Sequence, residues 1–310
     1  MTTISPLSRS FASRLRSNQA ALWSLAVIAL LILVAIVGPY LMKYPPNEQI
    51  DIVGLKNAPP SAMHPFGTDA FSRDLLSRVV SGARVSLGIS ALAVALSVTL
   101  GTAYGLVSGY TGGAVDSTMM RVLDGFLSIP RVLLLIALVT VWPRPMPFWT
   151  LAVIIGATGW FGVSRLVRAE TLTMRRAAFI EAAEALGASA TRTLWRHILP
   201  NVAAPVIVFA TLAVGNVILI ESGLSYLGAG TAIPTASWGA IFFDGMDSSA
   251  RAWWVLLFPG LAILVTVLAF NVLGDALRDV LDPRQLHASH PPTEGIEDAA
   301  ATSATLEKNG

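Results

Sequence analysis

Few side chains in this sequence could carry out covalent chemistry, and none falls in a pattern typical of an enzyme. The chain has no cysteine, which excludes a thiol nucleophile and a thiolate metal site. None of its three lysines follows a glycine, so the phosphate-binding G-x-x-x-x-G-K-[ST] loop is absent. The four histidines form no H-E-x-x-H pattern, and no G-x-S-x-G motif occurs. These residues are Lys43, Lys56, Lys308, His64, His197, His287 and His290. The sequence therefore predicts no catalytic residue, no metal and no cofactor.

Four charged residues remain as candidates for a functional site. Asp69, Arg73 and Asp74 are close enough in sequence to form a substrate or metal site, although an ion-pair and turn network that orders a loop is the favoured interpretation. Glu221 lies near the end of an apolar segment, where buried carboxylates often mark ion pathways. Either an ion pathway or a structural hydrogen-bonding role is compatible with Glu221 at this point.

The composition places most of the chain in lipid. Of its 310 residues, 13% are charged, about half the ~25% typical of soluble proteins. Apolar residues make up 54%, and the mean hydropathy is +0.65. A net charge of +2 is too small to favour a nucleic-acid partner. A spanning helix needs roughly 20 mostly apolar residues. Segments free of ionisable residues and long enough to span are 20–42, a stretch within 85–116, 146–164, 198–220 and 252–274.

A sixth span is predicted over residues 126–142, although it contains Arg131 beside Pro130. An arginine near the end of a span can reach the headgroups, so we expect Arg131 near the interface. The charge-free residues 222–243 are rich in Gly, Ser, Thr and Pro, which predicts an ordered loop or a short interfacial helix. Within the second span, Gly101, Gly105 and Gly109 recur every four residues, a spacing that permits close helix packing.

The distribution of basic residues predicts the orientation. Six spans put both termini on one side, which receives 13 Lys and Arg residues against 7 on the other. The positive-inside rule makes the richer side cytoplasmic. The predicted organisation is a cytoplasmic tail (1–19) that either forms an amphipathic helix or frays, a six-span domain (20–284), and a disordered tail (285–310) in which the histidines are solvated. The domain includes external loops 43–84 and 222–251 and a cytoplasmic loop 165–200.

That cytoplasmic loop predicts two short helices that form a compact knob, defined here as residues 175–200. Residues 178–186 are rich in Ala, Glu and Leu, and Gly187 stands where a helix usually ends in the left-handed conformation. Ser189 can cap a second short helix, and Pro200 is expected to end it before the fifth span. Phe179, Ala183 and Leu186 give the first helix an apolar stripe. From these features alone, a helix pair lying on the membrane is equally compatible.

The spacing within the knob resembles a known signature. Glu181-Ala182-Ala183, Gly187 and Leu199-Pro200 match the E-A-A-x-x-x-G-x9-I-x-L-P pattern of ABC-importer permeases, with His197 at the isoleucine position. His-Ile-Leu-Pro-Asn at that place is similar to the peptide-type branch of these importers. A structural role of His197 is therefore favoured over a proton switch.

Four further segments resemble the dipeptide, oligopeptide and nickel permeases. Residues 160–170 (W-F-G-V-S-R-L-V-R-A-E) resemble the segment before the knob, which makes Arg165, Arg168 and Glu170 candidate supports of the knob. Residues 64–78 resemble an external segment of the C-type permease subunit, with Ser72 where that pattern has glycine. Residues 124–131 and 221–228 are similar to the branch too. Because the branch typically has glutamate at the position of Glu221, the resemblance favours a structural role for this residue. The resemblance extends over about residues 20–284.

The resemblance implies an all-α membrane protein of six transmembrane helices, with the type I ABC-importer permease architecture. It implies a second homologous permease subunit, two ATPase subunits that bind at the knob, an extracytoplasmic substrate-binding protein and lipid as partners. Peptides are the expected cargo, with nickel chelates or glutathione-like compounds as alternatives. An ion-coupled secondary transporter is less favoured because the sequence shows no clear internal repeat. An intramembrane enzyme is less favoured because no histidine lies within a predicted span.

Overall fold

The computed structural model describes residues 15–16, 18–143, 146–230, 235–246 and 251–281. Every regular element in this part of the chain is helical, and the one bridge of the strand type joins Thr68 to Asp74. The expectations for most of the N-terminal tail (1–14 and 17), for the C-terminal tail and for His287 and His290 lie outside the described residues.

The helices follow one another with short connections, apart from the loop between the first two long ones. In chain order they are α2 (Gln19–Leu41), α3 (Leu75–Thr111), α4 (Gly113–Leu127), α5 (Arg131–Val141), α6 (Phe148–Ala157), α7 (Trp160–Arg175), α8 (Ala178–Ala185), α9 (Ala190–Thr193), a π-helical turn (Leu194–Ile198), α10 (Leu199–Tyr226), α11 (Trp238–Gly245) and α12 (Trp254–Leu281).

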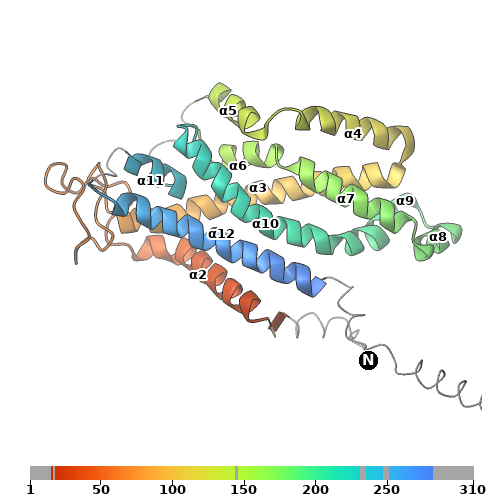
Figure 1. The fold of residues 1–310 in the computed structure, drawn as a ribbon, viewed down its shortest axis with the longest axis horizontal. Helices are drawn as coiled ribbons and strands as arrows, with labels where there is room; N and C mark the ends of the chain where they lie inside the picture. The colour runs from red at the N-terminus through yellow and green to blue at the C-terminus, as the bar shows by residue number, and fades with distance from the viewer. Residues whose placement is uncertain (1–14, 17, 144–145, 231–234, 247–250, 282–310) are drawn as a thin grey trace, which may run out of the picture.

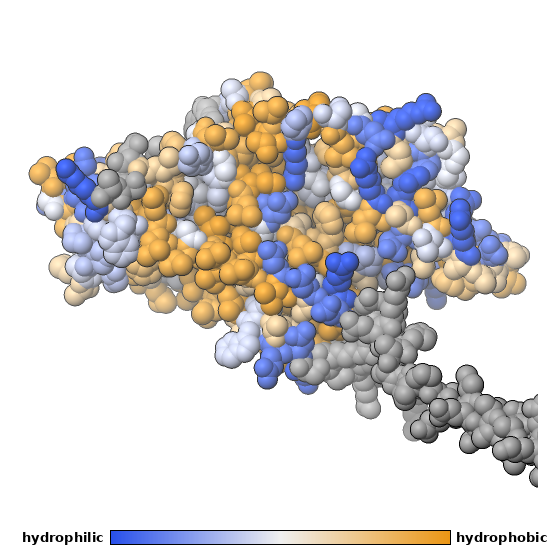
Figure 2. Space-filling model, viewed as in Figure 1, coloured by the Kyte–Doolittle hydropathy of each residue, from blue (hydrophilic) through white to orange (hydrophobic). Residues whose placement is uncertain are grey.

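The long helices form an elongated bundle in which α3 is central and packs against α2, α6, α7 and α10 (Figure 1). Residues 42–74 and α11 gather at one end of the bundle, called the loop end here. The helices α8 and α9 project from the other, called the knob end. Apolar side chains cover much of the middle of the visible face, and hydrophilic ones concentrate toward the ends (Figure 2). This is the surface expected of a protein whose middle lies in lipid.

Three buried apolar clusters succeed one another along α3 and hold the bundle together. The cluster at the loop end contains Leu75, Trp238 and Trp254. The middle cluster forms around Ile89 and packs α3 against α6. The cluster at the knob end joins the last turns of α3 to α7, α8 and the start of α10. Because one helix contributes to all three clusters, α3 connects the two ends of the molecule.

Four helices are individually long and apolar enough to span a membrane: Gln19–Leu41, Leu75–Thr111, the continuous helical run Ala190–Tyr226, and Trp254–Leu281. Two bent pairs pass the same test, α4 with α5 at 76° and α6 with α7 at 40°, which gives six spans if each pair counts as one. The predicted third span, 126–142, covers α5 and only the end of α4, and the predicted fourth, 146–164, covers α6 and the start of α7. Each is part of a bent pair and not a single straight helix. The first bend falls at Ser128 to Pro130, where proline disfavours helical geometry in the residue before it.

The prediction that Pro200 ends a helix before the fifth span is wrong. Pro200 lies in the first turn of α10, and helical structure runs without a break from α9 through the π-helical turn into α10. Proline removes one backbone hydrogen bond from such a continuous run, and the π-helical turn Leu194–Ile198 directly before Pro200 is the local irregularity that accompanies it. The Asn201 side chain donates to the carbonyl of His197 at 2.6 Å, which satisfies one backbone acceptor near the proline.

Candidate functional site

The first helix of the knob, α8, ends in a complete glycine cap. Gly187 has a φ of 88°, which confirms the predicted left-handed conformation. The Ala188 N–H donates to the carbonyl of Ala183 at 3.0 Å, and the Gly187 N–H donates to that of Glu184 at 2.9 Å. This pair of bonds defines the Schellman motif, which satisfies the last carbonyls of the helix. Gly187 therefore sets the direction in which the chain leaves α8.

The apolar side chains of the knob divide into one buried anchor and an exposed set. Ile180 is fully buried in the cluster at the knob end. Phe179 is 49% exposed, Leu186 is 89% exposed and Trp195 is 67% exposed. The predicted stripe therefore faces outward and not into the protein. Exposed apolar side chains gathered in this way are typical of a surface that receives another molecule.

The remaining signature residues surround this surface. Glu181 lies in the first turn of α8 and is exposed, as is Ala182, while Ala183 is half-buried. His197, in the π-helical turn, and Leu199, the first residue of α10, are half-buried, and Pro200 is exposed. Leu199 packs against the cluster that buries Ile180. The structure thus brings the signature residues together at one end of the molecule.

The glycines of α3 attach the knob to the bundle through α7. A Cβ on Gly101 would lie 2.6 Å from that of Val163, and one on Gly105 would lie 2.6 Å from the carbonyl oxygen of Ser164. A Cβ on Gly109 would lie 2.8 Å from that of Thr171. Only glycine permits such an approach, so the predicted close packing is confirmed, and α7 of the same chain is the helix that fills it. Because α7 leads directly into the knob, this packing connects α3 to the start of the knob.

The two arginines expected to support the knob contact α4 instead. Arg168 binds Asp116 through Nε at 2.5 Å and through Nη2 at 2.6 Å, and Ser108 donates to the same carboxylate. Arg165 pairs with Asp124 in an exposed position. Glu170 is half-buried on α7. Bidentate arginine–carboxylate pairs fix geometry as well as charge, so these contacts hold α4 on α7.

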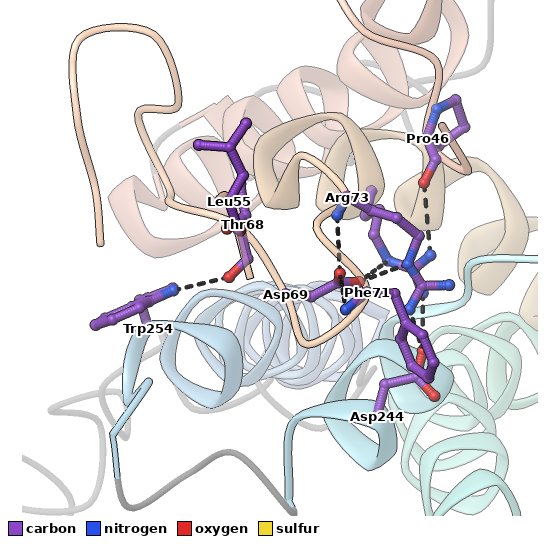
Figure 3. A network of polar contacts seen from close by, with 9 residues as sticks. Pro46, Leu55, Thr68, Asp69, Phe71, Arg73, Asp244 and Trp254 are labelled. Atoms are coloured by element: carbon purple, nitrogen blue, oxygen red, sulfur yellow. Dashed lines mark hydrogen bonds and ion pairs between the residues drawn. The ribbon is translucent and has the colours of Figure 1, made fainter. Parts of the chain in front are cut away.

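At the loop end, Asp69 and Arg73 belong to a buried network of charges (Figure 3). Asp69 accepts from the backbone N–H groups of Phe71 and Arg73, each at 2.9 Å, and pairs with Arg73 Nε at 2.6 Å. Arg73 and Arg78 both reach Asp244 of α11, at 2.8 and 3.1 Å. The network therefore ties the loop to the start of α3 and to α11.

Asp74 performs a separate task beside this network. Its carboxylate accepts from the Ser77 N–H at 2.8 Å, which caps α3, and pairs with His64 Nδ1 at 2.8 Å. Ser72 has a φ of 60° at the position where the resembled pattern has glycine. Farther out in the loop, the backbone N–H groups of Gly54 and Val53 donate to Asp51 and lower the pKa of that carboxyl.

Glu221 is buried where α10, α11 and α3 meet. Its Oε1 accepts from Ser225 at 2.9 Å and from Ser237, the cap of α11, at 2.7 Å. Next to it, the N–H of Trp238 donates to the Ser86 hydroxyl at 3.1 Å. These contacts position α11 on the bundle.

Arg131 differs from the expectation that its side chain reaches the headgroups. Its Nη2 donates to the carbonyl of Ile155 at 3.0 Å. The break between α6 and α7 leaves carbonyls near the end of α6 without their usual helical donors. The guanidinium therefore turns inward because the break supplies an acceptor.

Residues 101–287 match the model of the binding-protein-dependent transport system inner membrane component family. The chain belongs to this family. Residues 5–60 match a second model, the N-terminal transmembrane domain of oligopeptide transport permease C. This permease is therefore a multi-pass protein of the inner membrane, and the resemblance stated from the sequence is confirmed.

Curated relatives of this permease cover nearly the whole chain. It is 39% identical to the oligopeptide transport system permease protein OppC of Bacillus subtilis over 87% of this chain and 88% of that protein. It is 43% identical to the protein of the same name from Escherichia coli, over 87% and 89%. It is 38% identical to the dipeptide transport system permease protein DppC of Bacillus subtilis, over 87% and 84%.

Sequence reasoning missed three residues that organise this permease. Asp244 completes the charge network at the loop end, Asp116 forms an ion pair with Arg168, and Tyr110 contacts the knob from the last turn of α3. Each lies more than 50 positions from at least one of its partners. The available signal was the presence of single acidic or phenolic side chains at the ends of apolar segments.

Proposed function

We propose that this chain is the C-type permease subunit of an ATP-driven importer that moves peptides across the cytoplasmic membrane. The family description and the names of the relatives, which are oligopeptide and dipeptide permeases, support the proposal. In the complex, the chain pairs with a second homologous permease subunit. Two ATPase subunits bind on the cytoplasmic side, and a substrate-binding protein delivers cargo on the other. ATP hydrolysis belongs to the ATPase subunits.

The knob end is the cytoplasmic end in this proposal. The side that holds the knob and both predicted termini has 13 Lys and Arg residues, and the other side has 7. Three of those seven lie in the long loop before α3 and two more in the first turns of that helix, all within the predicted external loop 43–84, and long loops have less weight in the positive-inside rule. The loop end, with its buried charge network, then faces the binding protein.

The mechanism is mechanical, and the observation that carries it is the exposed apolar surface of α8. Phe179 and Leu186 project from a helix whose position is set by the buried Ile180 and whose exit is set by Gly187. Such a helix can seat in a groove of an ATPase subunit and move with it. The close packing of α7 on α3 then carries the displacement toward the loop end.

Substitution of Gly187 tests the proposal. A Cβ at Gly187 meets no atom within 4 Å, so Gly187→Val acts through the backbone conformation and not through a clash. A β-branched residue strongly disfavours a φ near 88°. We expect Gly187→Val to weaken binding of the ATPase subunits and abolish uptake of trialanine into proteoliposomes containing the whole complex.

Gly125→Val is the matched control, because a Cβ there also meets no atom within 4 Å and its backbone is ordinary helix. We expect this control to keep both activities. Unchanged ATPase binding and uptake in Gly187→Val would contradict the coupling role of the knob. Gradient-driven uptake of trialanine by the chain without ATPase subunits would contradict the proposed function itself.

A further inference from the structure

The knob helix α8 depends on few contacts for its orientation. It has eight residues, and Ile180 is the only one of them that is buried. A helix this short is not stable by itself in water, so tertiary contacts must hold it. Ile180 anchors the helix at one point. A single anchor leaves rotation about that point free, so a second contact is needed to fix its direction.

Tyr110 supplies that second contact from the last turn of α3. Its hydroxyl donates to Glu184 Oε1 at 2.9 Å. The guanidinium of Arg175, at the end of α7, lies 5.4 Å from the centre of its ring. The ring also packs against the cluster that contains Ile180. One side chain of α3 thus touches the end of α7, the last turns of α8 and the apolar cluster between them.

We propose that Tyr110 is a positioning residue for coupling, which fixes the direction of α8 through Glu184 so that displacement of the knob moves α3. The inference rests on the proposed function. It adds a contact that bypasses the α7–α8 connection, since the bond from Glu184 reaches α3 directly. Without it, α8 could tilt about Ile180 when an ATPase subunit pulls on it, and the displacement would be lost before it reached the bundle.

Hydrogen exchange measures the positioning directly. In the full complex in nanodiscs, Tyr110→Phe should increase the exchange rate of the α8 amides about three- to tenfold, as expected for the loss of one ordinary, solvent-exposed hydrogen bond. Glu184→Gln keeps an oxygen acceptor and should match the wild type, whereas Glu184→Ala should match Tyr110→Phe. The double variant should exchange no faster than either single variant, because both remove the same bond.

Tyr104→Phe is the matched control. Tyr104 lies on the same helix and donates its hydroxyl to the carbonyl of Met119 in α4 at 2.6 Å. It should leave exchange in α8 unchanged. Equal effects of Tyr104→Phe and Tyr110→Phe, or additive effects of Tyr110→Phe and Glu184→Ala, would overturn the proposal.

The functional readout separates positioning from simple assembly. With trialanine and the binding protein present, Tyr110→Phe should keep its ATPase subunits but lose at least about half of the stimulation of ATP hydrolysis, and Glu184→Gln should retain it. Loss of ATPase association in Glu184→Ala but not in Tyr110→Phe would show that Glu184 binds the ATPase, which would overturn the proposal. A wild-type complex without stimulation would contradict the proposed function, while the exchange measurement would still decide the role of Tyr110.

Discussion

Replacing Ser72 by glycine should stabilise the loop end. Ser72 is fully buried, has a φ of 60°, and its hydroxyl has no hydrogen-bond partner among the described residues. Its backbone is held on both sides, because its N–H donates to Asp69 and its carbonyl accepts from Ile50. The turn therefore cannot relax to a conformation that suits serine better.

The expected gain follows from three terms. Relief of the left-handed conformation contributes about 1–2 kcal/mol. Removal of an unpaired buried hydroxyl contributes about 1–3 kcal/mol. The extra freedom of glycine in the unfolded chain costs about 0.5–1 kcal/mol. The free energy of local opening should therefore rise on the order of 3 kcal/mol, which slows exchange of the loop amides about 100-fold.

Hydrogen exchange at Asp69 and Leu75 is the assay, because their N–H groups donate to Arg73 and Gly67 within the turn. Ser72→Ala serves as the control. It removes the hydroxyl but keeps the Cβ, so it should gain only the contribution from the unpaired buried hydroxyl. A Ser72→Gly variant that exchanges no more slowly than Ser72→Ala would refute the conformational part of this reasoning. Faster exchange than in the wild type would refute all of it.

Three more predictions concern packing and charge. Gly105→Val should destabilise the protein by about 3 kcal/mol, the upper end of the usual cost of overpacking, and lower its thermal midpoint, because the new Cβ meets backbone. Gly88→Val is the control, since the nearest neighbour of a Cβ there lies 4.0 Å away, and equal midpoints of the two variants would contradict the packing. Asp244→Ala should lower the free energy of unfolding by about 3–5 kcal/mol because two buried arginines lose a shared partner. A decrease of less than about 1 kcal/mol, measured by thermal unfolding, would show that solvent replaces the Asp244 carboxylate. Arg168→Asp should speed exchange in α4 about tenfold, and Asp116→Arg added to it should restore protection; no rescue would argue against the pair.

Local patterns in the sequence were sufficient for the features that depend on neighbouring residues. Apolar segments predict where the chain enters lipid, and each predicted span overlaps one of the four long helices or two bent pairs, although most of α4 lies outside the predicted third span. The left-handed cap at Gly187 and the close packing at Gly105 follow from residue type and spacing. The signal for each lies within one turn or one helix, so a single segment contains it, but that segment does not specify that α7 is the helix packed on Gly105.

Features that depend on distant segments were not predictable in this way. Nothing near Arg168 indicates that it binds Asp116, and nothing near Arg73 indicates Asp244. Proline usually ends or kinks a helix, which predicts a helix end at Pro200. Its actual effect depends on the local helix geometry around it, which the sequence does not specify. Whether Arg131 turns inward likewise depends on a break in α6 and α7 that lies elsewhere in the chain.

The length of α3 restricts how this protein can change over time. The helix has 37 residues, about 55 Å, and it holds Arg78 at one end in register with α11 and Tyr110 at the other in register with the knob. Inserting or deleting a single residue between them would rotate one end against the other by about 100°. Descendants of this chain can therefore exchange residues along α3 and vary the loops around it, but they cannot alter the number of residues in the helix without losing one end.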